Sequence, residues 1–159
     1  MPTSPETRLQ ELGIELPATP APAGAYVPAT KAGNLVFTAG QLPLKAGELT
    51  LRGKVGDTVS VDEAREAARL CAMNAISAAS TQTDGVAGIS RIVKVTGFVA
   101  SAPGFSDQPQ VINGASEFLG EVFGDAGLHA RSAVGVAELP MDAPVEVELV
   151  VETHSDTPG

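Results

Sequence analysis

The sequence predicts an α+β protein in which one face of a β-sheet is covered by two helices. Two long segments carry apolar residues at helical spacing, while several shorter segments alternate apolar and polar residues as strands do. Along the chain these segments run strands, helix, strand, helix and two strands. Such an order favours a sheet whose apolar face is buried by the two helices.

The length of the chain bounds its organisation. Its 159 residues lie within the usual size range of one domain, and its apolar fraction of 43% is ample for a core. We expect an N-terminal helix and a proline- and alanine-rich connector at 1–25, a single domain at 26–153 and a frayed tail at 154–159.

A short helix is expected at the N-terminus, over residues 6–12. Thr3 or Ser4 can cap it, and Glu6 would complete a capping box. Gly13 follows the last turn, where glycine commonly ends a helix.

Three strand segments are expected before the first long helix. Residues 26–30 and 34–38 flank a short turn in which Gly33 can adopt a positive φ, so they predict a hairpin. Pro28 has no N–H for a sheet ladder and would place the first of these strands at an edge. Residues 49–51 predict a third, short strand.

The first long helix has the clearest signals in the chain. Ser60 and Glu63 form a capping box, and the apolar positions that follow at helical spacing are almost all alanine. Small side chains allow this helix to lie close to a sheet, with Cys71 as a buried thiol.

The second long helix and the strand before it are also predicted from local signals. Residues 92–99 are strongly apolar and predict a buried strand. Asp107 would cap this helix, with Gln110 three residues further along the chain as its capping-box partner. Gly124 would end the helix.

Arg131 is the strongest functional candidate, because it is the only lysine or arginine after Lys94. Residues 132–137 and 145–152 alternate as strands, which would hold Arg131 and Glu146 as fixed groups on a sheet. A planar guanidinium can take a substrate carboxylate in a bidentate grip, and a nearby, partly buried carboxylate can pass a proton between water and substrate. The alternative for Arg131 is an ordinary surface ion pair.

Other candidates have equally plain structural alternatives. Glu148 shares a strand face with Glu146 and competes with it, although both can also form an ordinary solvated surface. Tyr26, the only tyrosine, either lines a cleft or packs against the core. Asn113, within the second long helix, either contacts a ligand or is solvated.

Composition and motifs argue against several classes of function. The formal charge of −9 argues against nucleic acid or anionic membranes as partners, and the apolar runs fall short of the roughly 20 residues of a membrane-spanning helix. One cysteine and no apolar leader favour the cytoplasm. His129 and His154 are too far apart for a recognisable metal site, and the glycine-containing segment 85–88 lacks the lysine and hydroxyl of a phosphate loop. We therefore expect no metal and no cofactor.

Three separated segments resemble the YjgF/RidA family, also called reactive intermediate deaminases. Residues 24–27 and 34–43 are similar to the amino-terminal hairpin of the family, and residues 130–147 are similar to its carboxy-terminal signature. Between them, Phe105 and Asn113 fall around the start of the family's second helix. The spacing from arginine to glutamate is the most specific part of the resemblance.

The resemblance implies a chorismate-mutase-like protomer, with a mixed sheet and two helices on one face, that assembles as a homotrimeric barrel. It implies cofactor-free hydrolysis of small carboxylate-bearing enamines and imines, such as 2-aminoacrylate, to 2-keto acids and ammonia. By position, Arg131 would bind the substrate carboxylate, Glu146 would orient or activate water, and Tyr26 would line the cleft. The further substrate-binding positions would be Ala39, Gly40, Asn113 and Ala133.

Two departures from the family pattern leave other interpretations open. Ala39 stands where many deaminases carry a serine, and Ala133 stands where a cysteine often follows the arginine and serine. Both changes remove polar atoms, which favours a noncatalytic trimer that binds a small carboxylate, whereas Glu146 favours the enzyme. A third interpretation, an endoribonuclease or translation inhibitor, would need a basic groove that this acidic chain lacks.

Overall fold

A computed structural model describes residues 3–22 and 24–154 of the chain. The part of the predicted tail at 155–159 therefore lies outside the described residues. The elements in chain order are α1 Pro5–Glu11, β1 Ala29–Ala32, β2 Leu35–Thr38, β3 Leu44–Lys45, β4 Glu48–Leu49, α2 Val61–Ser80, η1 Val86–Gly88, β5 Ile89–Ala100, α3 Gln108–Phe123, η2 Gly124–Gly127, β6 Ala130–Val136, η3 Pro140–Asp142 and β7 Val145–Thr153.

The main sheet is mixed, as the family resemblance implied. Its strand order is β1-β2-β7-β5-β6, and β3 pairs only with β4 in a separate small sheet. The neighbours β5 and β6 run parallel, and the other neighbouring strands of the main sheet run antiparallel. Burial alternates strictly along β7 from buried Val145 to buried Thr153, so one face of the sheet forms the core and the other is more open.

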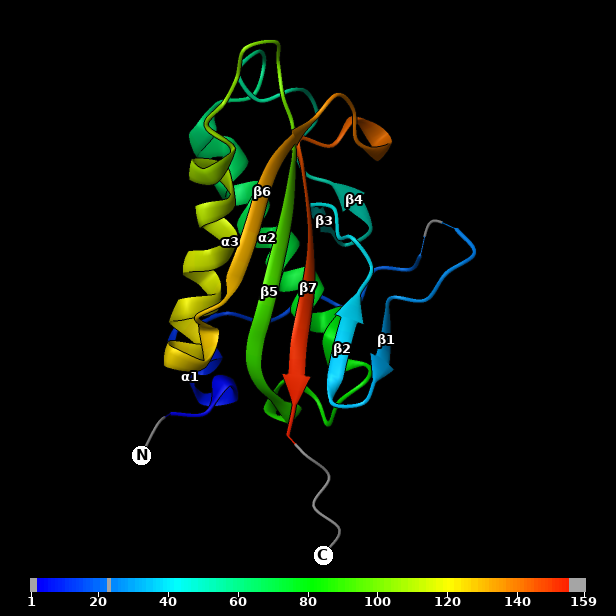
Figure 1. Cartoon of the computed structure of the whole chain (residues 1–159), viewed down its shortest axis with the longest axis vertical. Coiled ribbons are helices and arrows are strands. Elements are labelled where there is room, and N and C mark those ends of the chain that lie inside the picture. Colours follow the sequence, from blue (N-terminus) through cyan, green and yellow to red (C-terminus); the bar gives the residue numbers. More distant parts are fainter. Residues whose placement is uncertain (1–2, 23, 155–159) are drawn as a thin grey trace, which may run out of the picture.

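Two helices cover the core face, as predicted, and Figure 1 shows α2 behind the sheet. Helix α2 contacts β7 and β2, while α3 contacts β5 and β6. The helices also contact each other closely, because a Cβ at Gly114 of α3 would collide with the backbone carbonyl of Arg65 in α2. Cys71 is fully buried on the alanine-rich side of α2, as expected. Within the described part of the chain, no helix combines the length and apolar character required to cross a bilayer.

The N-terminal helix packs on α3, although its cap differs from the prediction. Ser4 is the N-cap and its hydroxyl accepts from the Thr7 N–H, so Thr7, not Glu6, occupies the third helical position and the predicted capping box is wrong. The Arg8 Nε donates to the Glu121 carbonyl of α3 at 3.0 Å. This contact ties the start of the chain to the helical layer.

The strands before α2 also differ from the prediction. Strand β1 begins at Ala29 rather than residue 26, although it is an edge strand as expected. The predicted strand at 49–51 is instead half of the β3–β4 hairpin, which turns through Ala46 at φ 52° and Gly47 at φ 80°. A positive φ at alanine is uncommon, so a tight turn through Ala46 was not expected.

The caps of the long helices agree in part with the prediction. The capping box of Ser60 and Glu63 forms at the start of α2. Asp107 is the N-cap of α3 but its side chain makes no capping hydrogen bond, so no capping box with Gln110 is present. Gly124 follows α3 with a φ of 59°, a conformation that suits glycine at the end of a helix.

Candidate active site

Arg131 is held against helix α3 at one edge of the sheet. It pairs with buried Val95 of β5 and therefore belongs to the row of side chains that faces the helices. Its Nη1 donates to Asn113 Oδ1 at 2.7 Å and to Ser116 Oγ at 3.2 Å, and its Nη2 makes a long contact of 3.4 Å with the Pro109 carbonyl. About two turns of α3, from Pro109 to Ser116, thus hold the guanidinium of this residue of the edge strand β6.

These contacts leave part of the Arg131 guanidinium able to bind a ligand. An arginine has five N–H donors, and the three contacts occupy both hydrogens of Nη1 and one of Nη2. The Nε–H and the other Nη2–H have no hydrogen-bond partner within residues 3–22 and 24–154. Nε and Nη2 form the side of the guanidinium, its side-on fork, that matches the two oxygens of a carboxylate.

The position of the Glu146 carboxyl group is set by close packing. A Cβ added to Gly40 would lie 2.6 Å from Glu146 Oε1 and 2.8 Å from its Cδ, so glycine leaves the space that the carboxyl group fills. Gln41 fixes this approach, because its N–H donates to the Val147 carbonyl at 2.8 Å and its carbonyl accepts from the Val147 N–H at 3.0 Å. The carboxyl group therefore rests directly on the backbone of Gly40.

A buried asparagine holds the loop that follows Gly40. The side-chain amide of Asn74, in α2, donates to the carbonyls of Leu42 at 3.0 Å and Leu44 at 2.9 Å. Asn74 is fully buried, so these bonds are shielded from competing water. The loop is consequently anchored to the helical layer at the point where it leaves β2.

The electrostatics of Glu146 suit a group that handles a proton. Burial raises the pKa of Glu146, and the negative charge of Glu148 two residues along the same strand raises it further. A carboxyl group with a raised pKa keeps a protonated fraction closer to neutral pH than an exposed glutamate does. Glu146 can therefore act as either a proton donor or a proton acceptor.

The expectation that Arg131 and Glu146 lie close together does not hold within one chain. Strand β5 separates β6 from β7, which places the two residues about 10 Å apart across the sheet alone. Glu146 pairs with Phe98 of β5, in the register opposite to that of Val95 and Arg131, so the two side chains start from opposite faces. One protomer thus presents two separate groups of candidate residues.

The other predicted residues divide between these groups or lie apart from both. Asn113 contacts Arg131 directly, and Ala133 is half-buried on the same helix-facing row as Arg131. Ala39 adjoins Gly40, and its N–H donates to the Pro28 carbonyl. Tyr26 is 51% exposed and precedes β1, at the sheet edge opposite to β6.

Two polar residues beside Arg131 were not predicted as part of the site. Ser116 Oγ contacts Arg131, and His129 Nε2 lies 2.9 Å from the same oxygen. The signal for Ser116 is its spacing of three residues from Asn113, which places both on one face of α3. The signal for His129 is its spacing of two residues from Arg131, because side chains two residues apart in an extended chain point to the same side.

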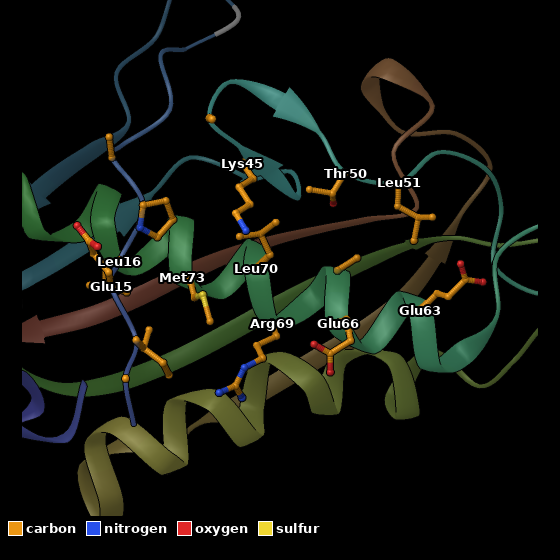
Figure 2. Close-up of a pocket in the computed structure, with 16 residues that line it drawn as sticks. Glu15, Leu16, Lys45, Thr50, Leu51, Glu63, Glu66, Arg69, Leu70 and Met73 are labelled. Carbon is orange, nitrogen blue, oxygen red and sulfur yellow. The ribbon is translucent and has the colours of Figure 1, made fainter. Parts of the chain in front are cut away.

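A groove of about 1030 Å³ lies elsewhere on the molecule, outside α2. Its walls are the segment 13–18 and the β3–β4 hairpin, and Figure 2 shows Leu70 and Met73 of α2 along its floor with Lys45 above them. None of the predicted site residues lines this groove. Across the described residues, no group of three or more His, Cys, Asp and Glu side chains is arranged to hold a metal ion.

The sequence matches the model of a known family over most of its length. The YjgF/chorismate-mutase-like family model, whose description also names an endoribonuclease, matches residues 6–153. The chain therefore belongs to the YjgF/RidA family, as the resemblance indicated.

Particular relatives share most of their length with this chain. Protein TCP17 of Trypanosoma cruzi is 42% identical over 148 residues, which cover 92% of each protein. A 2-iminobutanoate/2-iminopropanoate deaminase of Dermatophagoides farinae is 35% identical and covers 87% of this chain and 93% of its own length. The crystal structure of Atu1372 from Agrobacterium tumefaciens, a protein with unknown function, is 45% identical with a TM-score of 0.85, over 94% of this chain and 93% of that one.

Proposed function

We propose that this protein hydrolyses small enamines and imines that carry a carboxylate, such as 2-aminoacrylate, to 2-keto acids and ammonia without a cofactor. The observation that carries the proposal is the Arg131 guanidinium, which Asn113 and Ser116 hold while its side-on fork stays available. The similarity to a deaminase of this substrate class at 35% identity supports the choice of reaction.

The proposed chemistry needs a held substrate, a proton and a placed water. Arg131 binds the carboxylate and so fixes the neighbouring C=N bond. The carboxyl group of Glu146 protonates the enamine carbon or the imine nitrogen, and its carboxylate then accepts a proton from the attacking water. Water adds to the iminium carbon as Glu146 takes its proton, which gives a carbinolamine. Glu146 then returns this proton to the amino nitrogen, the C–N bond breaks, and ammonia leaves. The hydroxyl becomes the C=O bond of the keto acid, and its proton goes back to the carboxylate of Glu146. Tyr26, Ala39, Gly40 and Ala133 would line the cleft.

We further propose that the complete site lies between subunits of a homotrimer. One chain does not bring Arg131 near Glu146, so the edge at β6 and α3 of one subunit would have to meet the open sheet face of another. That face carries apolar side chains that are poorly covered, with Phe37 41% and Val134 43% exposed. An exposed apolar face of this kind is typical of a subunit interface. The proposed domain at 26–153 contains every residue that is given a role.

The deciding experiment measures 2-keto acid and ammonia release from 2-aminoacrylate and bulkier imines generated in situ. The comparison is between wild type, Arg131→Ala and Arg91→Ala, because Arg91 is an exposed arginine on β5 that pairs with Glu152 outside the proposed site. We expect acceleration by wild type and Arg91→Ala and its loss in Arg131→Ala. Equal rates for all three proteins would contradict the proposal.

A second candidate function is noncatalytic binding of a small carboxylate. The observation that favours it is the lack of polar side-chain atoms at Ala39 and Ala133. A folded trimer that binds pyruvate through Arg131 yet accelerates no imine would support this function. The endoribonuclease named in the family description is disfavoured by the formal charge of −9, because RNA backbones require basic surfaces.

A further inference from the structure

We propose that Ser116 and His129 are positioning residues for Arg131, joined in a hydrogen-bonded relay that starts at the Gly127 carbonyl. The relay deepens the proposed function and rests on it, because its role is to aim the carboxylate-binding fork. The contacts that form it are His129 Nδ1 to Gly127 O at 2.6 Å, His129 Nε2 to Ser116 Oγ at 2.9 Å, and Arg131 Nη1 to Ser116 Oγ at 3.2 Å.

The direction of each hydrogen bond follows from the chemistry of its partners. A backbone carbonyl only accepts, so His129 Nδ1 must carry the hydrogen that lies toward Gly127. In the neutral imidazole the other nitrogen, Nε2, is then an acceptor, and it receives the Ser116 hydroxyl hydrogen. The Ser116 oxygen is left as the acceptor for Arg131 Nη1. The relay therefore assigns one tautomer to His129 and one orientation to the Ser116 hydroxyl.

The turn after α3 is built to present the Gly127 carbonyl to the imidazole. Gly124 ends α3 with a positive φ, and the short helix η2 follows. A Cβ at Gly127 would lie 2.5 Å from the Leu119 carbonyl, so only glycine allows the turn to rest on α3. His129 follows the turn directly before β6, two residues before Arg131.

The relay limits the freedom of the guanidinium. Without Ser116, Asn113 would hold one Nη1 hydrogen and only the long 3.4 Å contact to the Pro109 carbonyl would hold Nη2, so the planar group could swing. A second contact at Ser116 fixes the plane, and the imidazole in turn fixes the hydroxyl that makes this contact. Loss of the relay would leave the positive charge in place but misdirect the fork, so carboxylate binding should weaken while the chemical step at Glu146 is unaffected.

The first test is the tautomer of His129, which does not depend on any activity. The chain has two histidines, so a long-range ¹H–¹⁵N spectrum of wild type and His129→Gln assigns both imidazoles. At a pH where the ring is neutral, we expect the Nδ1–H form for His129. The Nε2–H form would overturn the relay.

The second test separates substrate binding from turnover. We expect Ser116→Ala and His129→Leu to raise KM for a carboxylate-bearing imine by roughly threefold to tenfold, with kcat within about twofold of wild type. Ser116→Thr keeps the hydroxyl and His129→Gln supplies an amide oxygen as acceptor, so both should restore KM. If no imine is turned over, Kd for pyruvate replaces KM in the same comparison.

The outcomes distinguish the two proposals. If Ser116→Ala and His129→Leu both keep the wild-type KM while Arg131→Ala raises it, the relay is overturned and the proposed hydrolysis is not. An equal loss of kcat in the disruptive and the conservative variants also overturns it, because positioning would be spared by the conservative ones. A wild-type protein that binds pyruvate but turns over no imine overturns the proposed hydrolysis and leaves the relay to be decided by Kd. A wild-type protein that neither turns over an imine nor binds pyruvate overturns both.

Discussion

The two groups of candidate residues are prepared for their tasks in different ways. The edge group, Arg131 with Asn113 and Ser116, is organised by hydrogen bonds that the guanidinium donates to side chains of α3. The face group, Glu146 with Gly40, is organised by close packing that raises the pKa of a carboxyl group. Hydrogen bonds suit a group that must hold an anion, whereas burial suits a group that must exchange a proton. Changes to the face group should therefore lower kcat, whereas changes to the edge group should raise KM.

The largest expected effect comes from the face group. Glu146→Gln removes the exchangeable proton but keeps the shape of the side chain, so kcat for imine hydrolysis should fall by about 10² to 10⁴ while KM changes little. The measurement is the steady-state rate of keto-acid release.

Glu148→Gln is the matched control for this prediction, since it lies on the same strand face two residues away. Its kcat should stay within about tenfold of wild type. The pH dependence of its rate should shift toward acid, because the charge of Glu148 contributes to the raised pKa of Glu146. A larger loss of kcat in Glu148→Gln than in Glu146→Gln would contradict this prediction and indicate that Glu148 transfers the proton.

The edge group should respond through binding. Arg131→Lys keeps the positive charge but loses the planar fork and the contacts to Asn113 and Ser116. We expect kcat/KM to fall by about 10-fold to 100-fold, mostly through KM, as charge-assisted hydrogen bonds contribute about 1.5 to 3 kcal/mol. Kinetics over a wide range of imine concentration measure the split. An unchanged KM would show that a point charge suffices and that the fork has no role.

Disrupting the contact between Gly40 and Glu146 should lower kcat by a smaller factor. In Gly40→Ala the new methyl group would meet Glu146 Oε1, so the carboxyl group must move and kcat should fall by about tenfold. Gly120→Ala is the control, because a Cβ there meets nothing within 4 Å and a helical alanine should stabilise α3 slightly. Full activity in Gly40→Ala would mean that the position of Glu146 is not critical.

Much of the fold follows from local signals in the sequence. The capping box of Ser60 and Glu63, the alanine-rich stripe with Cys71 and the alternation along β7 each predicted an element that the structure contains. The β3–β4 hairpin was not predicted, because its turn depends on a positive φ at Ala46. Local patterns cannot anticipate a conformation that most alanines avoid.

The candidate site was predictable as a set of residues but not as an arrangement. The sequence places Arg131 and Glu146 on consecutive strands, and only the strand order inserts β5 between them. Pairing between distant strands depends on the whole sheet rather than on local spacing. The contact of Gly40 with Glu146 is likewise set by the register of Gln41 with Val147, across more than a hundred residues of chain.

The smallest effect that separates the two groups is one on stability. The raised pKa of Glu146 means that the folded protein favours its protonated form. The resulting stabilisation is fully present below the ordinary glutamate pKa of 4.5 and is lost as pH rises through the pKa of the folded state. Glutamine carries no such charge, so Glu146→Gln should unfold at a higher temperature than wild type near pH 7, and this gain should shrink as pH falls toward 4.

Thermal unfolding across this pH range is the measurement, with exposed Glu48→Gln as a control for the loss of one negative charge from the acidic surface. A gain of the same size at every pH would show that packing, and not the buried charge, distinguishes the face group.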